Sequence, residues 1–245
     1  MRASFQAADG EVLVVTGGAN GIGAAAARAF AAAGGHVTVL DVAPSAELEG
    51  VERVAQARVD VADRDAVLAA IADVVERHGR VDGLIAGAAV QPRVPVADMA
   101  PEDWRRTLAI NLDGVVWAVQ AVLPHMRKQR RGSIIAFASG LAHMGHPEAS
   151  AYAASKGALI AFVKSLAGEV AGDRVRVNVV FPGVIDTPQF REANPGSERQ
   201  HWLETTGIGD VADVVGPLLF LLSDAASMTG SILTRDRVFR VEDDA

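Results

Sequence analysis

Short runs rich in β-branched residues alternate with alanine-rich helical stretches along nearly the whole chain, and this alternation constrains the fold most. The first run, residues 11–16, predicts a buried strand, and residues 21–33 predict a helix that ends at Gly34 and Gly35. The same patterns predict further strands at 36–41, 57–60, 81–87, 133–139, 174–181 and 231–235, and helices at 63–78, 101–131, 149–171 and 210–223. Strands joined by helices form right-handed crossovers, so we expect an α/β protein with a doubly wound parallel sheet.

Nothing in the chain marks a domain boundary. The 245 residues contain no linker rich in Pro, Gly or Ser and no internal repeat. Half of the residues are hydrophobic and 22% are charged, which excludes an intrinsically disordered chain. We therefore predict a single domain over residues 1–245, with a polar and irregular stretch at 188–209.

Composition excludes several classes of function. With no cysteine, the chain has no disulfide, thiolate metal site or cysteine nucleophile. The net charge of −7, with no basic block beyond residues 127–131, argues against nucleic acid as a partner. No apolar run approaches the ~18 residues of a membrane helix, and the N-terminus lacks the apolar core of a signal peptide. We expect a cytoplasmic protein without a membrane partner, and we find no metal-ligand spacing.

A glycine-rich turn lies between the first predicted strand and the first predicted helix. It contains Gly17, Gly18, Gly21 and Gly23, and the spacing G-x-x-x-G-x-G is formed by Gly17, Gly21 and Gly23, with Asn20 and Ile22 among the intervening residues. Glycine lets the backbone approach a pyrophosphate closely, and the helix N-terminus offers free N–H groups to that anion. This context indicates a nucleotide site in a dinucleotide-binding (Rossmann) domain; the alternative is a glycine turn without a ligand.

Asp41 ends the second predicted strand, 18 residues after Gly23. A carboxylate at that place can accept hydrogen bonds from both hydroxyls of an adenosine ribose. An ordinary surface aspartate at a strand end is the alternative, but the glycine-rich turn favours the ribose role.

Four polar residues are candidates for chemistry. Tyr152 and Lys156 are four residues apart, so they share one helix face and the phenol can approach the ammonium. A free phenol has a pKa of about 10, and a nearby cation favours the phenolate. Ser139 follows the fifth predicted strand, 13 residues before Tyr152, where its hydroxyl can bind a substrate oxygen. Asn111 opens a helical stretch, and taken singly each of these residues also fits a structural role, such as a helix cap for Asn111.

Together these residues resemble the short-chain dehydrogenase/reductase family in its compact form. The similarity extends over nearly the whole chain and agrees in spacing as well as in residue type. It includes the glycine-rich turn, Asp41, Asp60 and Val61, Asn111, Ser139, Tyr152 with Lys156, residues 182–187, residues 220–227, and Thr229 with Gly230. Two segments differ: residues 86–89 read Ala-Gly-Ala-Ala where the family has Asn-Asn-Ala-Gly, and residues 236–238 read Asp-Arg-Val where the family has Asp-Gly-Gly.

The resemblance implies a nicotinamide dinucleotide cofactor and a role for each matching residue. Tyr152 would be the general acid/base, Ser139 would polarise the reacting oxygen, and Lys156 would bind the nicotinamide ribose and lower the pKa of Tyr152. Asn111 would anchor a water in a proton relay. Asp60 and Val61 would flank the adenine, and Ile185 and Thr187 would bind the carboxamide. The remaining implied cofactor contacts are Gly17, Asn20, Gly21, Ile22, Gly23, Gly87, Pro182 and Gly183.

The resemblance also bears on assembly and substrate. Family members are usually tetramers and sometimes dimers, so a homotetramer is expected, packed through residues 111–130 and 150–171. The 188–209 stretch corresponds to the family's substrate lid. It and the loop at 143–146 carry polar side chains and few apolar ones, which favours a small hydroxylated or carboxylated substrate.

We therefore predict an NAD-dependent enzyme that interconverts a secondary alcohol and a ketone, since Asp41 favours NAD over NADP. Two alternatives remain: an anabolic ketoreductase acting on a 3-oxoacyl or polyketide substrate, and a catalytically silent nucleotide sensor on the same fold. The tail arginines Arg235, Arg237 and Arg240 suggest a further hypothesis, that one of them favours an anionic substrate. The alternative for these arginines is a solvated edge strand.

Overall fold

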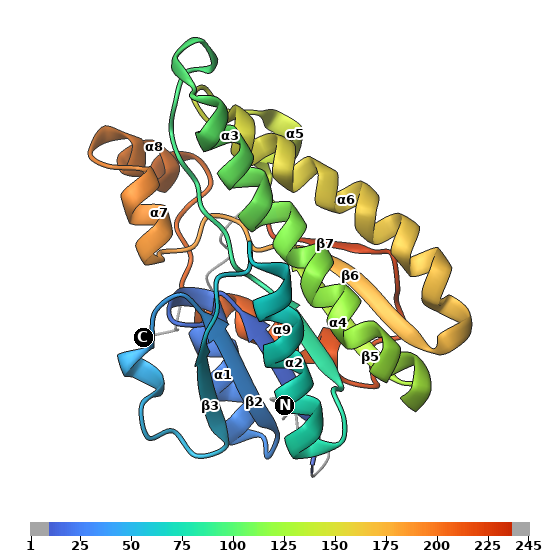
Figure 1. Ribbon diagram of the computed structural model, residues 1–245. Coiled ribbons are helices and arrows are strands. Elements are labelled where there is room, and N and C mark those ends of the chain that lie inside the picture. Colours follow the sequence, from blue (N-terminus) through green and yellow to red (C-terminus); the bar gives the residue numbers. More distant parts are fainter. Residues whose placement is uncertain (1–9, 237–245) are drawn as a thin grey trace.

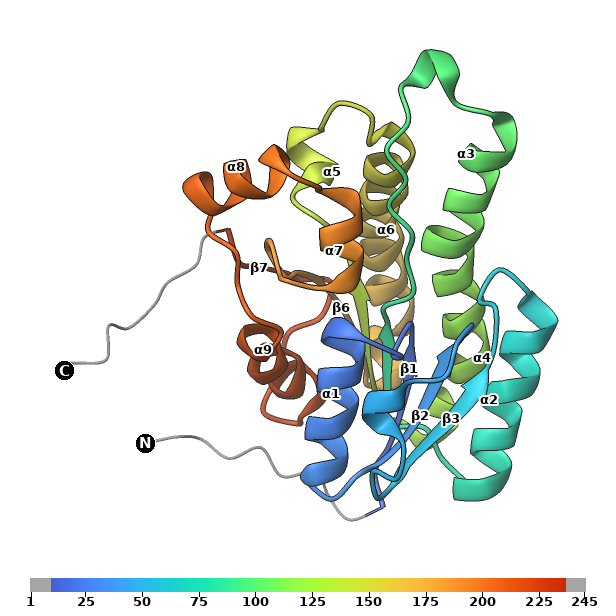
Figure 2. The ribbon, with the colours of Figure 1, turned by 90° about the vertical axis from the view of Figure 1, so that its left-hand side faces the viewer.

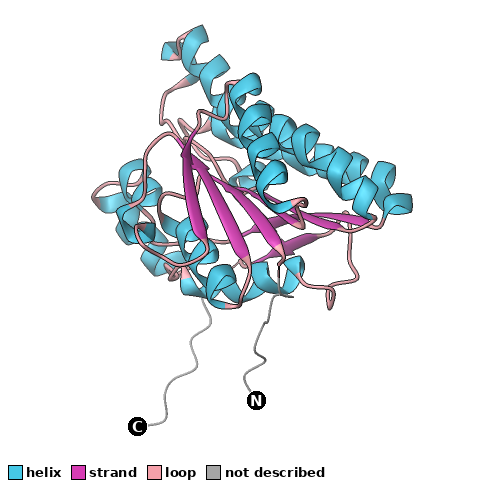
Figure 3. Cartoon of the chain, turned by 60° about the horizontal axis from the view of Figure 1, so that its bottom comes forward, coloured by secondary structure: helices cyan, strands magenta, loops and turns pink. Residues whose placement is uncertain are grey.

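The computed structural model describes residues 10–236 and contains a seven-stranded parallel sheet between two layers of helices (Figures 1 and 3). This confirms the predicted α/β, Rossmann-like fold. The strand order is β3-β2-β1-β4-β5-β6-β7. The strands are β1 (Val12–Thr16), β2 (His36–Asp41), β3 (Val54–Arg58), β4 (Gly83–Ala86), β5 (Gly132–Phe137), β6 (Val175–Phe181) and β7 (Ile232–Thr234). The α-helices are α1 (Gly21–Ala32), α2 (Arg64–His78), α3 (Pro101–Leu108), α4 (Gly114–Gln129), α5 (Leu141–Met144), α6 (Ser150–Val170), α7 (Pro188–Ala193), α8 (Ser197–Thr205) and α9 (Ala212–Leu222).

Each face of the sheet has its own apolar core, because successive side chains of a strand point to opposite faces. In β1, Val12 and Val14 pack with α2, α4 and α6, whereas Leu13 and Val15 pack with α1 and α9. Every residue of β1 is buried, as expected for a central parallel strand covered on both sides. The two layers of helices fix the sheet from both sides and leave its carboxyl-terminal edge open for a ligand.

The strand order reverses between β1 and β4, and a parallel sheet opens a crevice at such a point. The turn after β1 and the segment after β4 approach each other closely there. A Cβ atom on Gly17 would lie 2.4 Å from the Cα of Ala88, and Gly17 has a φ of 69°. Only glycine tolerates both the positive φ and the close approach, so Gly17 and the small residues at 86–89 are required together for this packing.

The third strand lies at Val54–Arg58, whereas the sequence predicted 57–60. The prediction was therefore wrong by three residues at the start of the strand and by two at its end. The ladder with β2 fixes this register and pairs Val37 with Val54 and Asp41 with Arg58. Because β3 is an edge strand and is only partly buried, its own residues carry little apolar pattern. Pairing with β2, rather than local sequence, sets where it begins.

The sequence predicted an irregular stretch at residues 188–209. The structure instead contains two short helices there, α7 and α8 (Figure 2). The Thr187 hydroxyl accepts a hydrogen bond from the Phe190 N–H at 3.2 Å, and Pro188 occupies the first turn, so both N-terminal signals of a helix are present in α7. Helix α8 has no buried residue and therefore no apolar stripe that the sequence could reveal.

Helices α3 and α4 are joined by one π-helical turn, η3 (Ala109–Asp113), into a continuous helical segment from Pro101 to Gln129. By length and composition alone this segment could cross a membrane. In the structure α4 packs against α2, and its buried residues join the core beneath the sheet. That packing is typical of a core helix, so the segment gives little support for a membrane span.

Candidate active site

Tyr152, Lys156 and Ser139 meet at the carboxyl end of β5. Tyr152 and Lys156 lie in the first turns of α6, and both are buried. The Lys156 ammonium donates a hydrogen bond to the Phe137 carbonyl at 2.8 Å and lies 5.7 Å from the centre of the Tyr152 ring. Ser139 follows β5 by two residues and forms a side-chain hydrogen bond with Tyr152. The structure thus brings together a phenol, a hydroxyl and an ammonium, as their spacing predicted.

Burial dominates the electrostatics of this group. It raises the pKa of the Tyr152 phenol, while the hydrogen bond with Ser139 and the positive charge of Arg93 act in the opposite direction. Burial also lowers the pKa of Lys156, from 10.5 to about 8. Protein atoms alone therefore keep the phenol protonated at neutral pH, which suits proton donation to a substrate oxygen.

Asn111 lies in the π-helical turn and is fully buried. Its Nδ2 atom donates hydrogen bonds to the Val90 carbonyl at 2.9 Å and to the Ser155 hydroxyl at 3.1 Å. The Ser155 hydroxyl in turn donates to the carbonyl of Tyr152 at 2.7 Å. Asn111 thus connects the segment after β4 to the helix that carries Tyr152, and π-helical turns often lie at functional sites.

The turn after β1 and the first turn of α1 form a cradle for an anion. In the described part of the chain, α1 has no acidic residue in its first turn and no side-chain cap at Asn20. The N–H groups of Gly21, Ile22 and Gly23 therefore face the crevice without a helical partner. A Cβ on Gly23 would lie 2.6 Å from the carbonyl oxygen of Gly17, so the cradle requires a residue without a side chain at this position.

Asp41 lies beside this cradle at the end of β2. One carboxylate oxygen accepts a hydrogen bond from the Ala19 N–H at 2.9 Å and the other from the Ala43 N–H at 3.3 Å. These bonds hold the carboxylate at the edge of the crevice. Arg58 is its register neighbour on β3, but no ion pair joins the two among the described residues.

Of the other residues expected near a cofactor, Gly87 lines the cavity that contains the cradle, whereas Asp60 and Val61 follow β3 and are not among the residues that line it. The Gly87 N–H donates to the Thr16 carbonyl at 3.0 Å, and Asp60 caps its own turn by accepting from the Ala62 N–H at 3.0 Å. Val61 is buried and packs so closely on Gly114 that a Cβ there would lie 2.8 Å away. Four further residues line the same cavity as the cradle: Pro182, Gly183, Ile185 and Thr187.

A cavity of about 640 Å³ extends from the glycine cradle to Tyr152 and on to the lid helices. Trp202 of α8 packs on the small cluster formed by Tyr152, Leu141 and Ala149. Its indole N–H donates to Asn194 Oδ1 at 3.0 Å, and the same oxygen accepts from Arg93 at 2.9 Å. Arg93 belongs to no sequence motif, and its contacts lie 53 to 101 residues away along the chain, so local sequence does not reveal it.

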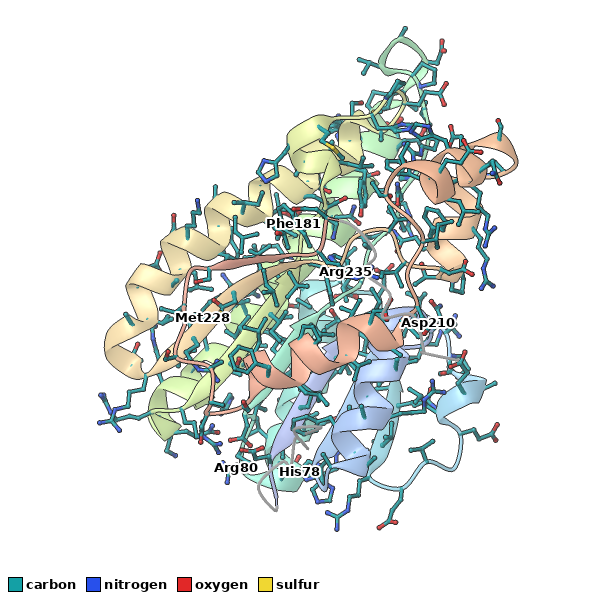
Figure 4. All side chains as sticks on the ribbon, turned by 180° about the vertical axis from the view of Figure 1, so that it is seen from behind. His78, Arg80, Phe181, Asp210, Met228 and Arg235 are labelled. Atoms are coloured by element: carbon teal, nitrogen blue, oxygen red, sulfur yellow. The ribbon has the colours of Figure 1, made fainter. Side chains whose placement is uncertain are left out.

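Of the three tail arginines, one of which is hypothesised to favour an anionic substrate, Arg235 lies within the described residues. Arg235 lines the cavity from the end of β7, near Phe181 and Asp210 (Figure 4). Its guanidinium is already paired with Asp213 at 2.8 Å, and its backbone N–H donates to the Phe181 carbonyl at 3.0 Å. Arg235 thus joins the end of β7 to α9, while Arg237 and Arg240 lie outside the described residues.

The fold and this arrangement define a dinucleotide-binding oxidoreductase, and comparison with known proteins agrees. A family model described as "short chain dehydrogenase" matches residues 11–198. The chain belongs to this family, as its motifs predicted. Within residues 10–236, no three His, Asp or Glu side chains are grouped so that they could hold a metal ion.

Several relatives are similar over almost their full length. A "Probable galactose dehydrogenase" of Rhizobium meliloti and a "3-oxoacyl-[acyl-carrier-protein] reductase" of Thermotoga maritima are each 36% identical over 239 residues, which cover 91% and 93% of this chain and 93% and 97% of theirs. A cis-4-hydroxycyclohexanecarboxylate dehydrogenase of Sinomonas cyclohexanicum is 36% identical over 92% of this chain and 94% of its own. The crystal structure of a Brucella melitensis 3-ketoacyl-(acyl-carrier-protein) reductase complexed with NADH superposes with a TM-score of 0.84 at 25% identity, covering 92% of this chain and 96% of that one.

Proposed function

We propose that the chain is an NAD-dependent dehydrogenase that interconverts a secondary alcohol and a ketone on a small polar substrate. One observation carries this proposal: the Ser139–Tyr152–Lys156 group opens into the same cavity as the glycine cradle. A substrate oxygen at Tyr152 and a dinucleotide at the cradle can therefore occupy one continuous space. When bound, the nicotinamide would supply the hydride acceptor in oxidation and the donor in reduction.

In this proposal each side chain has one task. The Tyr152 hydroxyl exchanges a proton with the substrate oxygen, and the Ser139 hydroxyl holds that oxygen in place. Lys156 places a positive charge beside the phenol and favours its ionised form, which oxidation requires. Asn111 orients the turn of α6 that carries Tyr152, through Ser155, in addition to the relay role that the resemblance implies.

The preference for NAD rests on Asp41. NADP has a phosphate where NAD has the ribose 2′-hydroxyl, and a carboxylate there repels a phosphate but accepts a hydrogen bond from a hydroxyl. The hydrogen bonds from the Ala19 and Ala43 N–H groups fix the carboxylate at that edge. The expected cofactor contacts of Gly17, Asn20, Ile22, Asp60, Val61 and Gly87 belong to the same proposal.

A small polar substrate is supported by the walls of the cavity. Polar side chains such as Gln91, Gln189 and Asn194 line it near the lid, and Trp202 narrows it above Tyr152. Two relatives are named for small polar substrates, galactose and cis-4-hydroxycyclohexanecarboxylate. We further expect a cytoplasmic homotetramer or dimer.

The ketoreductase alternative stays open because relatives of similar identity are 3-oxoacyl-[acyl-carrier-protein] reductases. A silent nucleotide sensor would not require Asn111, Ser139, Tyr152 and Lys156 together, so it is the weaker alternative. The decisive experiment measures NADH formation at 340 nm over a panel of sugars, cyclitols and hydroxy acids, with NADP in place of NAD as a comparison. In parallel, the oxidation of NADH or NADPH is followed with acetoacetyl thioesters. NAD-dependent oxidation supports the proposal; turnover confined to NADPH and thioesters would replace it with the ketoreductase.

A further inference from the structure

Arg93 places a positive charge in the part of the cavity that lies under the lid. It comes from the segment after β4, is half-buried and lines the cavity together with Ser139 and Tyr152. Its Nη2 atom donates to Asn194 Oδ1 at 2.9 Å, its Nη1 atom to His146 Nδ1 at 2.6 Å, and its Nε atom to the Ala193 carbonyl at 3.3 Å. The side chain is therefore held in one position by two segments, the loop that carries His146 and the end of α7.

None of the three partners of Arg93 is a carboxylate. Within residues 10–236 Arg93 forms no ion pair, whereas two other arginines at the lid are paired with carboxylates at 2.8 Å, Arg191 with Asp186 and Arg235 with Asp213. A guanidinium has five N–H donors, so these three contacts leave two of them for a ligand. The chain as a whole carries a net charge of −7, so this cation is a local feature and not part of a basic surface.

The charge of Arg93 reaches the reacting end of the cavity. It is one of the influences that lower the pKa of Tyr152 against the effect of burial. Trp202, which packs on the Tyr152 cluster, shares the Asn194 oxygen with Arg93. A molecule whose hydroxyl lies at Tyr152 therefore shares one cavity with the Arg93 guanidinium.

We propose that Arg93 is a specificity-determining residue that binds a carboxylate of the substrate, so that the enzyme acts on hydroxy acids or their oxo acids. This inference rests on the proposed function and narrows its substrate class. A carboxylate matches the fork of the guanidinium and provides the negative counter-charge that Arg93 lacks among the described residues. Arg93 thereby selects among secondary alcohols, and it takes no part in proton or hydride transfer.

The test compares acids with their uncharged analogues. Steady-state kcat/KM is measured with NAD for 4-hydroxycyclohexanecarboxylate and its carboxamide, 3-hydroxybutyrate and its carboxamide, and gluconate and glucose. Acetate and cyclohexanecarboxylate serve as inhibitors against the best neutral alcohol, each beside its amide. For wild type we expect the acid of the best pair to be favoured by about tenfold to hundredfold, the range of a charge-assisted hydrogen bond. In Arg93→Gln the acid and the amide should differ by less than about threefold, and in Arg93→Lys the preference should be intermediate.

A matched variant distinguishes the effect of the Arg93 charge from the effect of disturbing the lid contacts. Trp202→Phe removes the indole N–H that also binds Asn194 but leaves Arg93 in place. It should change kcat/KM for acid and amide by the same factor and keep their ratio. The pH profile of neutral-alcohol oxidation gives a second readout: it should shift to higher pH in Arg93→Gln, because the cation no longer lowers the pKa of Tyr152. Melting temperatures confirm that each variant folds.

The outcomes separate this inference from the proposed function. If wild type oxidises neutral alcohols but no acid is favoured over its amide as substrate or as inhibitor, the carboxylate assignment is wrong and the dehydrogenase proposal stands. If Arg93→Gln keeps the acid preference, the assignment is equally wrong. If wild type oxidises none of these alcohols with NAD, the proposed function is rejected. The role of Arg93 is then tested on whatever other turnover the protein shows, and equal inhibition of that turnover by an acid and by its amide would reject it.

Discussion

The side chain of Asn111 makes two hydrogen bonds with the backbone of Val90. Its Oδ1 atom accepts from the Val90 N–H at 2.8 Å, and its Nδ2 atom donates to the Val90 carbonyl at 2.9 Å. The segment after β4 lacks the asparagines usual in the family at 86–89, and Asn111 holds this segment from the helical side. The positions of both Gly87 and Arg93 depend on that anchor.

Replacing Asn111 with Leu should destabilise the protein and lower its activity. Two buried backbone groups of Val90 and the Ser155 hydroxyl lose a partner, so we expect a loss of roughly 2–4 kcal/mol in the free energy of unfolding. Urea denaturation measures this loss. Asn178→Leu is the matched control, because Asn178 also bonds to backbone, at Met228 and Ser231, away from the cavity. It should lose comparable stability with a smaller loss of kcat; unchanged stability in the Asn111 variant would contradict an anchoring role.

Tyr152→Phe should leave the fold and NAD binding intact and lower kcat by about 10² to 10⁴-fold, the usual effect of losing a general acid/base. Turnover is followed at 340 nm, and NADH binding by its fluorescence. Ser133→Ala is a useful control, because the Ser133 hydroxyl bonds the Leu221 carbonyl at 2.7 Å, away from the cavity. Turnover near the wild-type value in the Phe variant would rule out the proposed mechanism.

The two directions of the reaction should depend on pH in opposite ways. Because burial raises the pKa of Tyr152, the protonated phenol prevails at neutral pH and the small phenolate fraction grows as pH rises. Oxidation should therefore accelerate from pH 6 upward, whereas reduction should stay nearly constant and slow only as the pH approaches the raised pKa of Tyr152. The gain in oxidation should flatten above about pH 8, where Lys156 loses its charge. Initial rates in both directions test this, and an oxidation rate that is flat or falls between pH 6 and 8 would contradict it.

Asp41 should give a preference for NAD(H) of about 10²-fold in kcat/KM. A carboxylate ~4 Å from a phosphate costs roughly 4 kcal/mol at an effective dielectric of ~20, and a third of that plus lost hydrogen bonds of ~1 kcal/mol each gives this factor. Asp41→Ala should reduce the preference mainly by weakening NAD. Arg58→Gln, at the register neighbour, should leave it unchanged. Equal or better wild-type activity with NADPH would refute the role of Asp41.

Lys156→Met should stabilise the protein at pH 7 while abolishing most activity. A lysine whose pKa falls from 10.5 to about 8 on folding binds protons less readily in the folded state than in the unfolded state. At pH 7 the buried ammonium therefore costs up to about 3 kcal/mol, and this cost declines as pH rises through 8 toward 10.5. Denaturation at pH 7 and pH 10 should show a stability gain that shrinks with pH. A variant less stable than wild type at pH 7 would show that the Phe137 hydrogen bond outweighs desolvation.

The sequence determined the parts of this protein that depend on local pattern. Short β-branched runs placed the central strands, because a parallel strand covered on both faces is apolar throughout, and helical periodicity placed the long helices, because each buries one face. The glycines at 17, 21 and 23 and the spacing of Tyr152 and Lys156 also follow from short-range geometry.

Tertiary structure decided whatever depends on contacts between distant segments. The register of β3 comes from β2, and the lid helices rest on Thr187 and on packing over Tyr152, so the local sequence carries little sign of either. Arg93 lacks any motif, and only folding brings it to His146 and Asn194, 53 and 101 residues further along the chain. Burial likewise raises the pKa of Tyr152 although a lysine lies one helical turn away, because desolvation depends on everything packed around the phenol rather than on its neighbours in sequence.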